Sequence, residues 1–296
     1  MDQSLKAHFA SLLGYSIFGF SFLFSKIALD LVSPFVLLSI RFLVAFAVLN
    51  LLWLTGKCGL CLRGKPVGML LLLGFVQPVL YFIFESYGIS QTSASFSGVM
   101  IGLAPVMGLV FGVLFLKEKC TAFQVICTLL SVLGVAMTTT GGFGASVSGF
   151  LLLLGAVVSA ALFAILSRGI APHFSAFERT YVMFALGSAV FTAIALVQNR
   201  QDMRAVFASL GEPALWVSVG YLAVVSSVCA FLLINYSLSH IPAGRALIFS
   251  NFTTVISVVA GILIMKDTFS PVQLLGIVII TASVFGVSVQ KEKTEA

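Results

Sequence analysis

The chain has 296 residues, of which 60% are hydrophobic and only 9% are charged, with a formal net charge of +6. Soluble domains carry about 25% charged residues, so this chain lacks the polar shell that water requires, which excludes a soluble enzyme. Its Lys and Arg residues are scattered singly, without a basic arm or stripe, which argues against nucleic acid as a partner. We therefore predict an integral membrane protein in contact with the lipid bilayer.

Ten apolar segments follow one another along the chain, and each is close to the roughly 20 residues that cross a bilayer as a helix. Turn residues separate them, notably Ser33-Pro34, the stretch Gly56 to Gly64, Gly141-Gly142 and Ile241-Pro242. We predict an all-α fold with ten membrane spans at residues 8–27, 34–55, 66–87, 94–116, 121–140, 148–168, 176–198, 214–236, 243–265 and 270–289.

The distribution of basic residues predicts the orientation. Ten spans place both termini on one side, and eleven of the 16 Lys and Arg residues fall on that side, with Arg200 and Arg204 as the main exceptions. Cytoplasmic loops carry the excess of Lys and Arg. We expect a multi-pass protein of the cell (inner) membrane with both termini in the cytoplasm, and no cleavable signal peptide is evident.

The two halves of the chain resemble each other. Ser-Tyr-Gly-Ile-Ser at 86–90 aligns with Asn-Tyr-Ser-Leu-Ser at 235–239, and Lys117-Glu118 aligns with Lys266-Asp267 at the same offset. Five spans is an odd number, so the second half enters the membrane from the opposite side. We predict two inverted five-helix repeats, residues 1–143 (helices 1–5) and 144–296 (helices 6–10), an arrangement that gives transporters two-sided access to a central site.

Charged residues inside the membrane are costly, at roughly 2.5–3.5 kcal/mol each at mid-helix. Several lie at the ends of predicted spans, and two lie clearly inside them, Arg41 and Glu85. Gln77, Tyr81 and Glu85 recur every four residues, so they share one face of the third helix, which lipid would not accept. We predict that this stripe faces a cavity, with Glu85 as a cation ligand or proton carrier. The alternative is a structural pair of Arg41 with Glu85; the sequence leaves open whether they pair.

Further candidates for a cavity lining are polar residues on other helices. Helix 9 is unusually polar in its first half, where an amide is harder to satisfy locally than a hydroxyl. The alternative is that these groups bond to their own backbone or join helices, and that the rings simply pack. The candidates are Tyr15, Asn235, Tyr236, Asn251 and Thr254.

Several short motifs follow one another along the first half of the chain. They are Gly14 to Lys26, Ser33-Pro34 with Arg41-Phe42, Tyr87-Gly88-Ile89-Ser90 with Ala94, Leu103-Ala104-Pro105-Val106, and Leu116 to Thr121 with Gln124 and Gly134. This order resembles the EamA-type transporters of the drug/metabolite transporter superfamily. The resemblance covers nearly the whole chain. It implies a ten-helix secondary transporter, often an exporter of amino acids, metabolites or drugs, with a cavity between the repeats. Met183 and Thr254 stand where the first half has Arg41 and Pro105, which implies an asymmetric cavity.

Signatures of catalysis are absent from the sequence, since there is no HExxH, GxSxG or P-loop motif. Its five Cys and three His form no metal site at recognisable spacing. We therefore expect no enzymatic activity, no metal and no cofactor.

These observations predict a secondary transporter that moves an amino acid-like or amphipathic solute by alternating access. We expect it to be an exporter. The alternatives are a membrane scaffold or sensor without flux of its own, and an intramembrane enzyme. Sequence alone does not fix the substrate, the direction, proton coupling, or whether the protein is a monomer or a homodimer.

Overall fold

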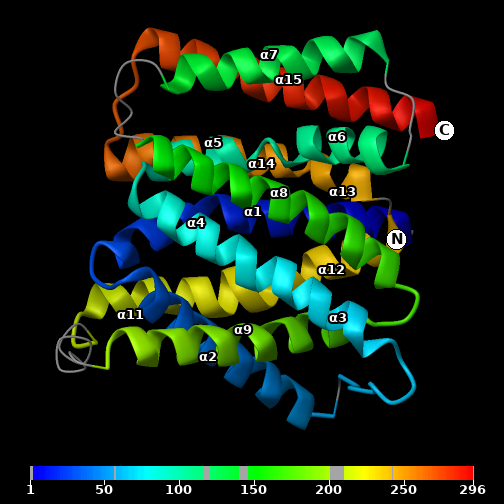
Figure 1. Ribbon diagram of the computed structural model, residues 1–296, viewed down its shortest axis with the longest axis vertical. Coiled ribbons are helices and arrows are strands. Elements are labelled where there is room, and N and C mark those ends of the chain that lie inside the picture. The colour runs from blue at the N-terminus through cyan, green and yellow to red at the C-terminus, as the bar shows by residue number, and fades with distance from the viewer. Residues whose placement is uncertain are drawn as a thin grey trace.

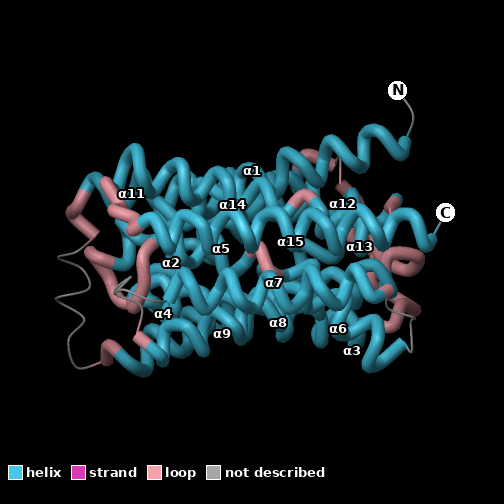
Figure 2. Tube along the Cα trace, turned by 90° about the horizontal axis from the view of Figure 1, so that it is seen from above, coloured by secondary structure: helices cyan, strands magenta, loops and turns pink. Residues whose placement is uncertain are grey.

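The computed structural model describes residues 3–56, 58–116, 121–139, 146–200, 210–241 and 243–295. Every regular element within these ranges is a helix (Figure 2). Several sequence features lie outside the described residues: Lys117-Glu118, Gly141-Gly142, the predicted boundary between residues 143 and 144, Arg204, and Pro242.

The first half of the chain builds five apolar spans, of which the third and fourth are interrupted. Ser33 is extended and Pro34 occupies the first helical position of the second span, where its missing N–H costs nothing. The elements are α1 (Gln3–Leu29), α2 (Pro34–Leu54), α3 (Val67–Gly74) with η1 (Phe75–Leu80) and α4 (Tyr81–Ser90), α5 (Ala94–Ile101) with α6 (Ala104–Leu116), and α7 (Ala122–Thr139).

The second half repeats this plan, again with interruptions in its third and fourth spans. Its second span begins with a capping box, in which Ser175 and Glu178 satisfy each other's free N–H groups. The elements are α8 (Val147–Ile170), α9 (Ala176–Gln198), α11 (Pro213–Gly220) with η2 (Tyr221–Cys229) and α12 (Ala230–His240), α13 (Ala243–Ile248) with α14 (Ser250–Ala260) and η3 (Gly261–Met265), and α15 (Pro271–Glu295).

Four spans that the sequence predicts as single helices therefore depart from a regular α-helix, namely the third and fourth of each half. In the second half the third span stays continuous but is π-helical over Tyr221–Cys229. In the third span Gln77 leaves the helical conformation (φ −146°, ψ 118°) just before Pro78, which has no N–H for a helical hydrogen bond. Gly102 and Leu103 separate α5 from α6. Irregular backbone at membrane depth is tolerated only where protein or a cavity covers it, so the breaks mark the interior of the bundle.

The helices pack with the symmetry of two inverted repeats. α1 lies against α12 and α14 of the second half, and its counterpart α8 lies against α4, α5 and α6 of the first half. The counterparts α2 and α9 contact each other directly, as do α7 and α15. Figure 1 shows the α7–α15 pair along one edge of the bundle and the α2–α9 pair along the opposite edge. This is the all-α fold of two inverted five-helix repeats that the sequence predicts.

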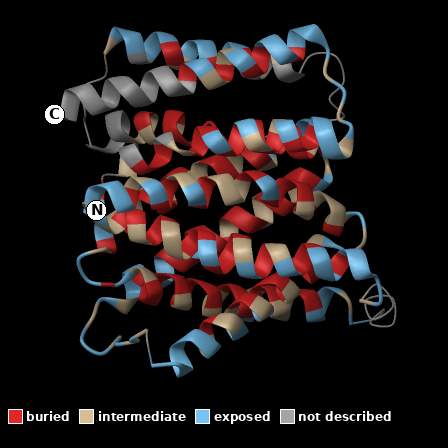
Figure 3. Ribbon diagram, turned by 180° about the vertical axis from the view of Figure 1, so that it is seen from behind, coloured by how far each residue is buried: buried red, intermediate tan, exposed pale blue. Residues whose placement is uncertain are grey.

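The surface of the bundle suits lipid. Seven helices within the described ranges are long and apolar enough to cross a membrane, and three further apolar helices are shorter. Large apolar side chains are exposed around the outside, whereas buried residues fill the middle (Figure 3). Both termini lie at the same end of the bundle (Figure 1).

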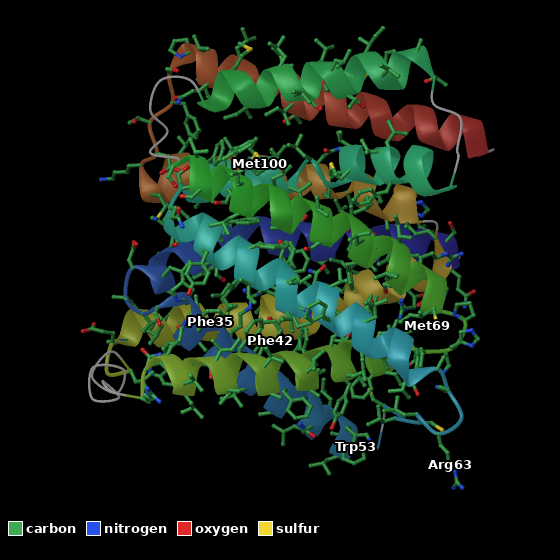
Figure 4. All side chains as sticks on the ribbon, viewed as in Figure 1. Phe35, Phe42, Trp53, Arg63, Met69 and Met100 are labelled. Atoms are coloured by element: carbon green, nitrogen blue, oxygen red, sulfur yellow. The ribbon has the colours of Figure 1, made fainter. Side chains whose placement is uncertain are left out.

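We name the two ends of the bundle by a lysine. The Lys65 end carries the termini and the loop from Gly56 to Pro66, and the Lys26 end carries the turns that follow α1, α4 and η3. Figure 4 shows Phe35 toward the Lys26 end of α2, and Trp53 and Arg63 toward the Lys65 end.

Candidate functional site

The polar stripe of the third span lies inside the protein. Gln77, Tyr81 and Glu85 are 3%, 6% and 3% exposed. The Tyr81 hydroxyl donates a hydrogen bond of 2.9 Å to Glu85 Oε1. Glu85 Oε2 and Gln77 Oε1 are buried without a hydrogen-bond partner among the described residues. Because a buried polar atom without a partner costs free energy, these two oxygens point to a ligand, water or proton that completes the site.

Arg41 is buried on α2 and binds the second half of the chain. Its Nε donates to Ser227 Oγ at 2.9 Å and its Nη2 to Ser226 Oγ at 3.2 Å, and both serines lie in the interrupted segment η2. The guanidinium carbon lies 4.4 Å from the centre of the Phe82 ring, within the range of a cation–π contact. Arg41 therefore joins the two halves.

Arg41 and Glu85 do not form the direct ion pair that the sequence left open. The ion pairs found among the described residues are Lys26–Asp30 and Lys65–Glu178. Arg41 donates hydrogen bonds to two serine hydroxyls, and Glu85 accepts a hydrogen bond from Tyr81. The two charges therefore interact only at longer range.

A small cavity lies between the two halves, next to the stripe. Its water-accessible volume is about 30 Å³, which is room for ordered water and not for a metabolite. A solute can occupy it only when the surrounding helices separate. Its lining residues come from both halves and meet at the helix breaks: Tyr15, Phe18, Phe22, Gln77, Tyr81, Ile101 and Ala104 from the first, and Ala160, Phe163, Ile234, Leu247, Ser250 and Thr253 from the second.

Three of the nine residues that the sequence singled out line this central cavity: Tyr15, Gln77 and Tyr81. Glu85 does not line the cavity itself, but it accepts a hydrogen bond from Tyr81, which does. On helix 9 the sequence favoured Asn251 and Thr254. Instead, Thr254 and Asn251 line an apolar groove between α14 and α15, and their neighbours Ser250 and Thr253 face the cavity.

Two pairs of polar residues share α14. Ser250 and Thr253 lie about one turn apart, and so do Asn251 and Thr254, about 100° further round the helix. The cavity therefore takes one pair and the groove takes the other, and composition alone does not say which. Thr253 donates a 2.8 Å hydrogen bond to the carbonyl of Tyr15, which joins α14 to α1.

Asn235 belongs to a separate polar cluster. It is fully buried, its amide Nδ2 donates to Thr180 Oγ1 at 3.0 Å, and its Oδ1 accepts from Ser167 Oγ at 2.7 Å. Arg179 donates to the Asn235 carbonyl at 2.5 Å and to Ser167 Oγ at 2.6 Å. These contacts satisfy the Asn235 amide within the protein, so it ties α8, α9 and α12 together.

Arg179 is a residue that sequence reasoning missed, because it was counted with the charges at the membrane surface. It is 0% exposed and hydrogen-bonded only to serine and asparagine groups within the described chain. A signal existed: Arg179 follows the capping box of Ser175 and Glu178, so it lies in the first turn of a span.

Tyr236 is partly buried and does not line the cavity; its ring lies tilted against that of His240, with ring centres 4.3 Å apart.

Comparison with known proteins identifies the fold. The model of the EamA-like transporter family matches the chain twice, at residues 5–140 and 147–289. The uncharacterized transporter YcxC of Bacillus subtilis (strain 168) is 35% identical over 98% of this chain and 95% of its own length. The uncharacterized transporter YetK of the same organism is 27% identical over 100% of this chain and 91% of its own.

One solved crystal structure of a protein shares the fold, with a TM-score of 0.66 and 17% identity over 99% of both chains. The helices, their lipid-compatible surface and these relatives together describe a multi-pass membrane transporter for a small molecule. The chain belongs to the EamA-like transporter family.

Proposed function

We propose that the protein is a secondary transporter that moves its solute through the central cavity by alternating access. The observation that carries the proposal is that this cavity lies between the two halves, where the lining residues meet at breaks in the spans. In inverted-repeat transporters, one repeat moves against the other around such a site. We further propose residues 1–143 and 144–296 as the two moving units.

The lining favours a solute with an apolar or aromatic body and a few polar groups. The rings of Phe18, Phe22 and Phe163 form much of the wall, together with those of Tyr15 and Tyr81. The free acceptor of Gln77 and the hydroxyl of Ser250, both without partners among the described residues, offer the polar contacts. An amino acid-like or amphipathic metabolite matches this pattern, in which a few polar groups orient a largely apolar ligand.

Proton coupling is supported by the link between the cavity and Glu85. Tyr81 lines the cavity and donates to the Glu85 carboxylate, so a solute that displaces the Tyr81 hydroxyl removes a hydrogen bond from Glu85. This contact gives a direct way for solute binding to change the proton affinity of the carboxylate. We propose that Glu85 carries the coupled proton.

The distribution of basic residues supports an orientation in the membrane. Basic residues outside the core lie toward the end that carries both termini, among them Arg63, Lys65 and Arg168, and excess basic charge marks the cytoplasmic side. We propose a protein of the cell inner membrane with both termini in the cytoplasm, acting as an exporter, as a monomer or a homodimer.

Flux measured in proteoliposomes tests the proposal, with Tyr81→Phe as the variant that removes one hydroxyl and keeps the ring. We expect wild-type protein to move a solute from a panel of amino acids, nucleosides and cationic drugs, and Tyr81→Phe to lower that flux about tenfold, because a lost hydrogen bond to a charged group is worth about 1.5–3 kcal/mol.

The matched control is Tyr87→Phe, because Tyr87 lies on the same helix but packs on Phe35 outside the cavity. A scaffold or sensor without flux of its own would move no solute, with or without a pH gradient. Equal flux in the Tyr81→Phe and Tyr87→Phe variants would place the pathway elsewhere.

A further inference from the structure

A second pocket opens at the Lys26 end of the bundle, apart from the central cavity. Its volume is about 400 Å³, enough for a small metabolite or a lipid headgroup. Polar residues form most of the lining. The residues are Lys26, Ser90, Gln91, Thr92, Ser93, Ala94, Met265 and Asp267.

Two opposite charges share this pocket without meeting. Lys26 comes from α1 in the first half, and Asp267 follows η3 in the second half. Neither of the ion pairs within the described ranges joins Lys26 to Asp267. Because the two charges do not neutralise each other, the ammonium can bind the anionic group of a ligand and the carboxylate can bind its cationic group.

The Lys26 ammonium is only loosely held. Its closest contacts are the Ile89 carbonyl at 3.4 Å and the Asp30 carboxylate at 4.0 Å, both longer than an ordinary charge-assisted hydrogen bond. Its side chain is 21% exposed. The ammonium can therefore turn to an incoming anionic group at little cost.

Asp267, by contrast, is fixed in position. Ser95 Oγ donates to Asp267 Oδ2 at 2.6 Å, and the Asp267 N–H donates to the Gly261 carbonyl at 3.0 Å. A carboxylate held in this way presents its charge to the pocket in a defined direction, which suits an ammonium group.

The start of α5 forms part of the pocket wall and helps to hold Asp267. Ser93 caps this helix by accepting the Phe96 N–H, and Ser93 and Ala94 line the pocket. The first N–H groups of a helix attract negative charge, and Ser95 in this first turn donates to the Asp267 carboxylate. The two side-chain charges therefore set the orientation of a ligand, with its anionic half at Lys26 and its cationic half at Asp267.

We propose that this pocket binds a zwitterionic group, with its anionic end at Lys26 and its ammonium at the Asp267 carboxylate. The site is separate from the proposed transport through the central cavity, because it lies at the Lys26 end of the bundle, between residues of the two halves. Two sources carry this chemistry: a free amino acid-type zwitterion, and the headgroup of phosphatidylethanolamine in the surrounding leaflet.

Thermal unfolding of the purified protein in maltoside micelles tests the site, because a ligand that binds the folded state raises its apparent stability. The free probe is L-leucine, compared at equal concentration with 4-methylpentanoate, which lacks the ammonium, and L-leucinamide, which lacks the carboxylate. The lipid probe is phosphatidylethanolamine in mixed micelles, compared with phosphatidylglycerol. We expect a zwitterionic probe to stabilise the protein and its single-charge counterpart to have little effect.

Two pairs of variants locate the binding. Lys26→Gln and Asp267→Asn should each weaken the apparent affinity about tenfold or more, since each removes a charge-assisted contact. Lys266→Gln and Glu212→Gln are the controls, because these exposed side chains carry the same charges but do not line the pocket. Shifts are read against each variant's own unfolding temperature. If Asp267→Asn fails to fold without its bond to Ser95, Lys26→Gln still carries the test.

Each outcome decides the proposal. Stabilisation by leucine alone supports a free zwitterion, and stabilisation by phosphatidylethanolamine alone supports a headgroup. No stabilisation by either probe, or a shift that survives in Lys26→Gln, overturns the site. Failure here leaves the flux difference between Tyr81→Phe and Tyr87→Phe unaffected, so the two proposals fail separately.

Discussion

At the scale of single residues, the surroundings of the Glu85 carboxylate are the most unusual feature of the candidate site. It is buried within a span, one of its oxygens accepts from Tyr81, and the other has no partner among the described residues. A carboxylate in this setting is costly as a purely structural group, because no cation of the described residues contacts it directly. This cost supports our proposal that Glu85 gains and loses a proton.

Replacement of Glu85 by Gln tests that role, since the amide keeps the size and still accepts from Tyr81 but cannot ionise. We expect flux in the Glu85→Gln variant to lose its dependence on pH, with the protein folded and expressed normally. The measurement is the initial rate of solute flux in proteoliposomes between pH 5.5 and 8.5. A pH profile identical to that of the wild type would contradict proton transfer at Glu85.

Single residues also show what the sequence could predict. Tyr81 and Glu85 lie one turn apart on α4, so their four-residue spacing predicts a shared buried face from local helix geometry alone. Gln77 is buried as well, but its backbone is not helical, so its position next to them depends on the break before Pro78. The burial of Arg179 was not predicted from its charge, because its partners Ser167 and Asn235 are distant in sequence and only tertiary packing brings them together.

At the scale of elements, the crossing of α5 with α14 is the tightest contact between the halves near the central cavity. A Cβ added at Gly98 would overlap the Ser257 side chain, and one added at Gly102 would overlap Thr254. Small residues allow such close approach in membranes, where van der Waals packing replaces the hydrophobic effect.

We expect Gly98→Ala to destabilise the protein by about 1–3 kcal/mol through overpacking. Gly108→Ala is the control in the same span, because a Cβ there would lie 3.4 Å from Leu247 Cδ1. The apparent unfolding temperature of each variant is the measurement. The double variant Gly98→Ala with Ser257→Gly should recover part of the loss. Equal stability of Gly98→Ala and Gly108→Ala would argue against a tight crossing.

The breaks explain why the sequence predicted the spans but not all of their inward faces. Composition and segment length identify each span, since the bilayer sets both. The interruptions near Gln77, Gly102 and Phe249 arise where the two halves meet, so no local pattern announces all of them. Composition also does not say which face of α14 turns inward, and in the structure Ser250 and not Asn251 lines the cavity.

At the scale of the whole molecule, a polar tie joins the two halves at the Lys65 end. Lys65 Nζ donates to both carboxylate oxygens of Glu178, at 2.7 and 2.8 Å, and the Cys61 N–H donates to Glu178 Oε1 at 3.0 Å. The loop between α2 and α3 is thereby held on the start of α9. A movement of one half against the other must carry or break this tie.

We expect Lys65→Gln to favour opening at the Lys65 end. The reporter is a cysteine at Ser250 in a background without native cysteines, labelled by a membrane-impermeant thiol reagent in inverted and right-side-out vesicles. Lys65→Gln should raise the labelling rate from that side severalfold, whereas Arg63→Gln, a basic residue of the same loop outside the tie, should not. An unchanged rate in Lys65→Gln would show that the tie does not hold the cavity closed.

The direct contacts of α2 with α9 and of α7 with α15 have a consequence for how such a molecule can originate. Each joins two counterpart helices across a pseudo-two-fold axis, so each is an isologous contact, of the kind that joins two identical subunits. A single five-helix unit inserted in both directions would already possess these two interfaces. Fusion then frees the copies to diverge, and the placement of Glu85 and Arg41 in only one of them marks that divergence.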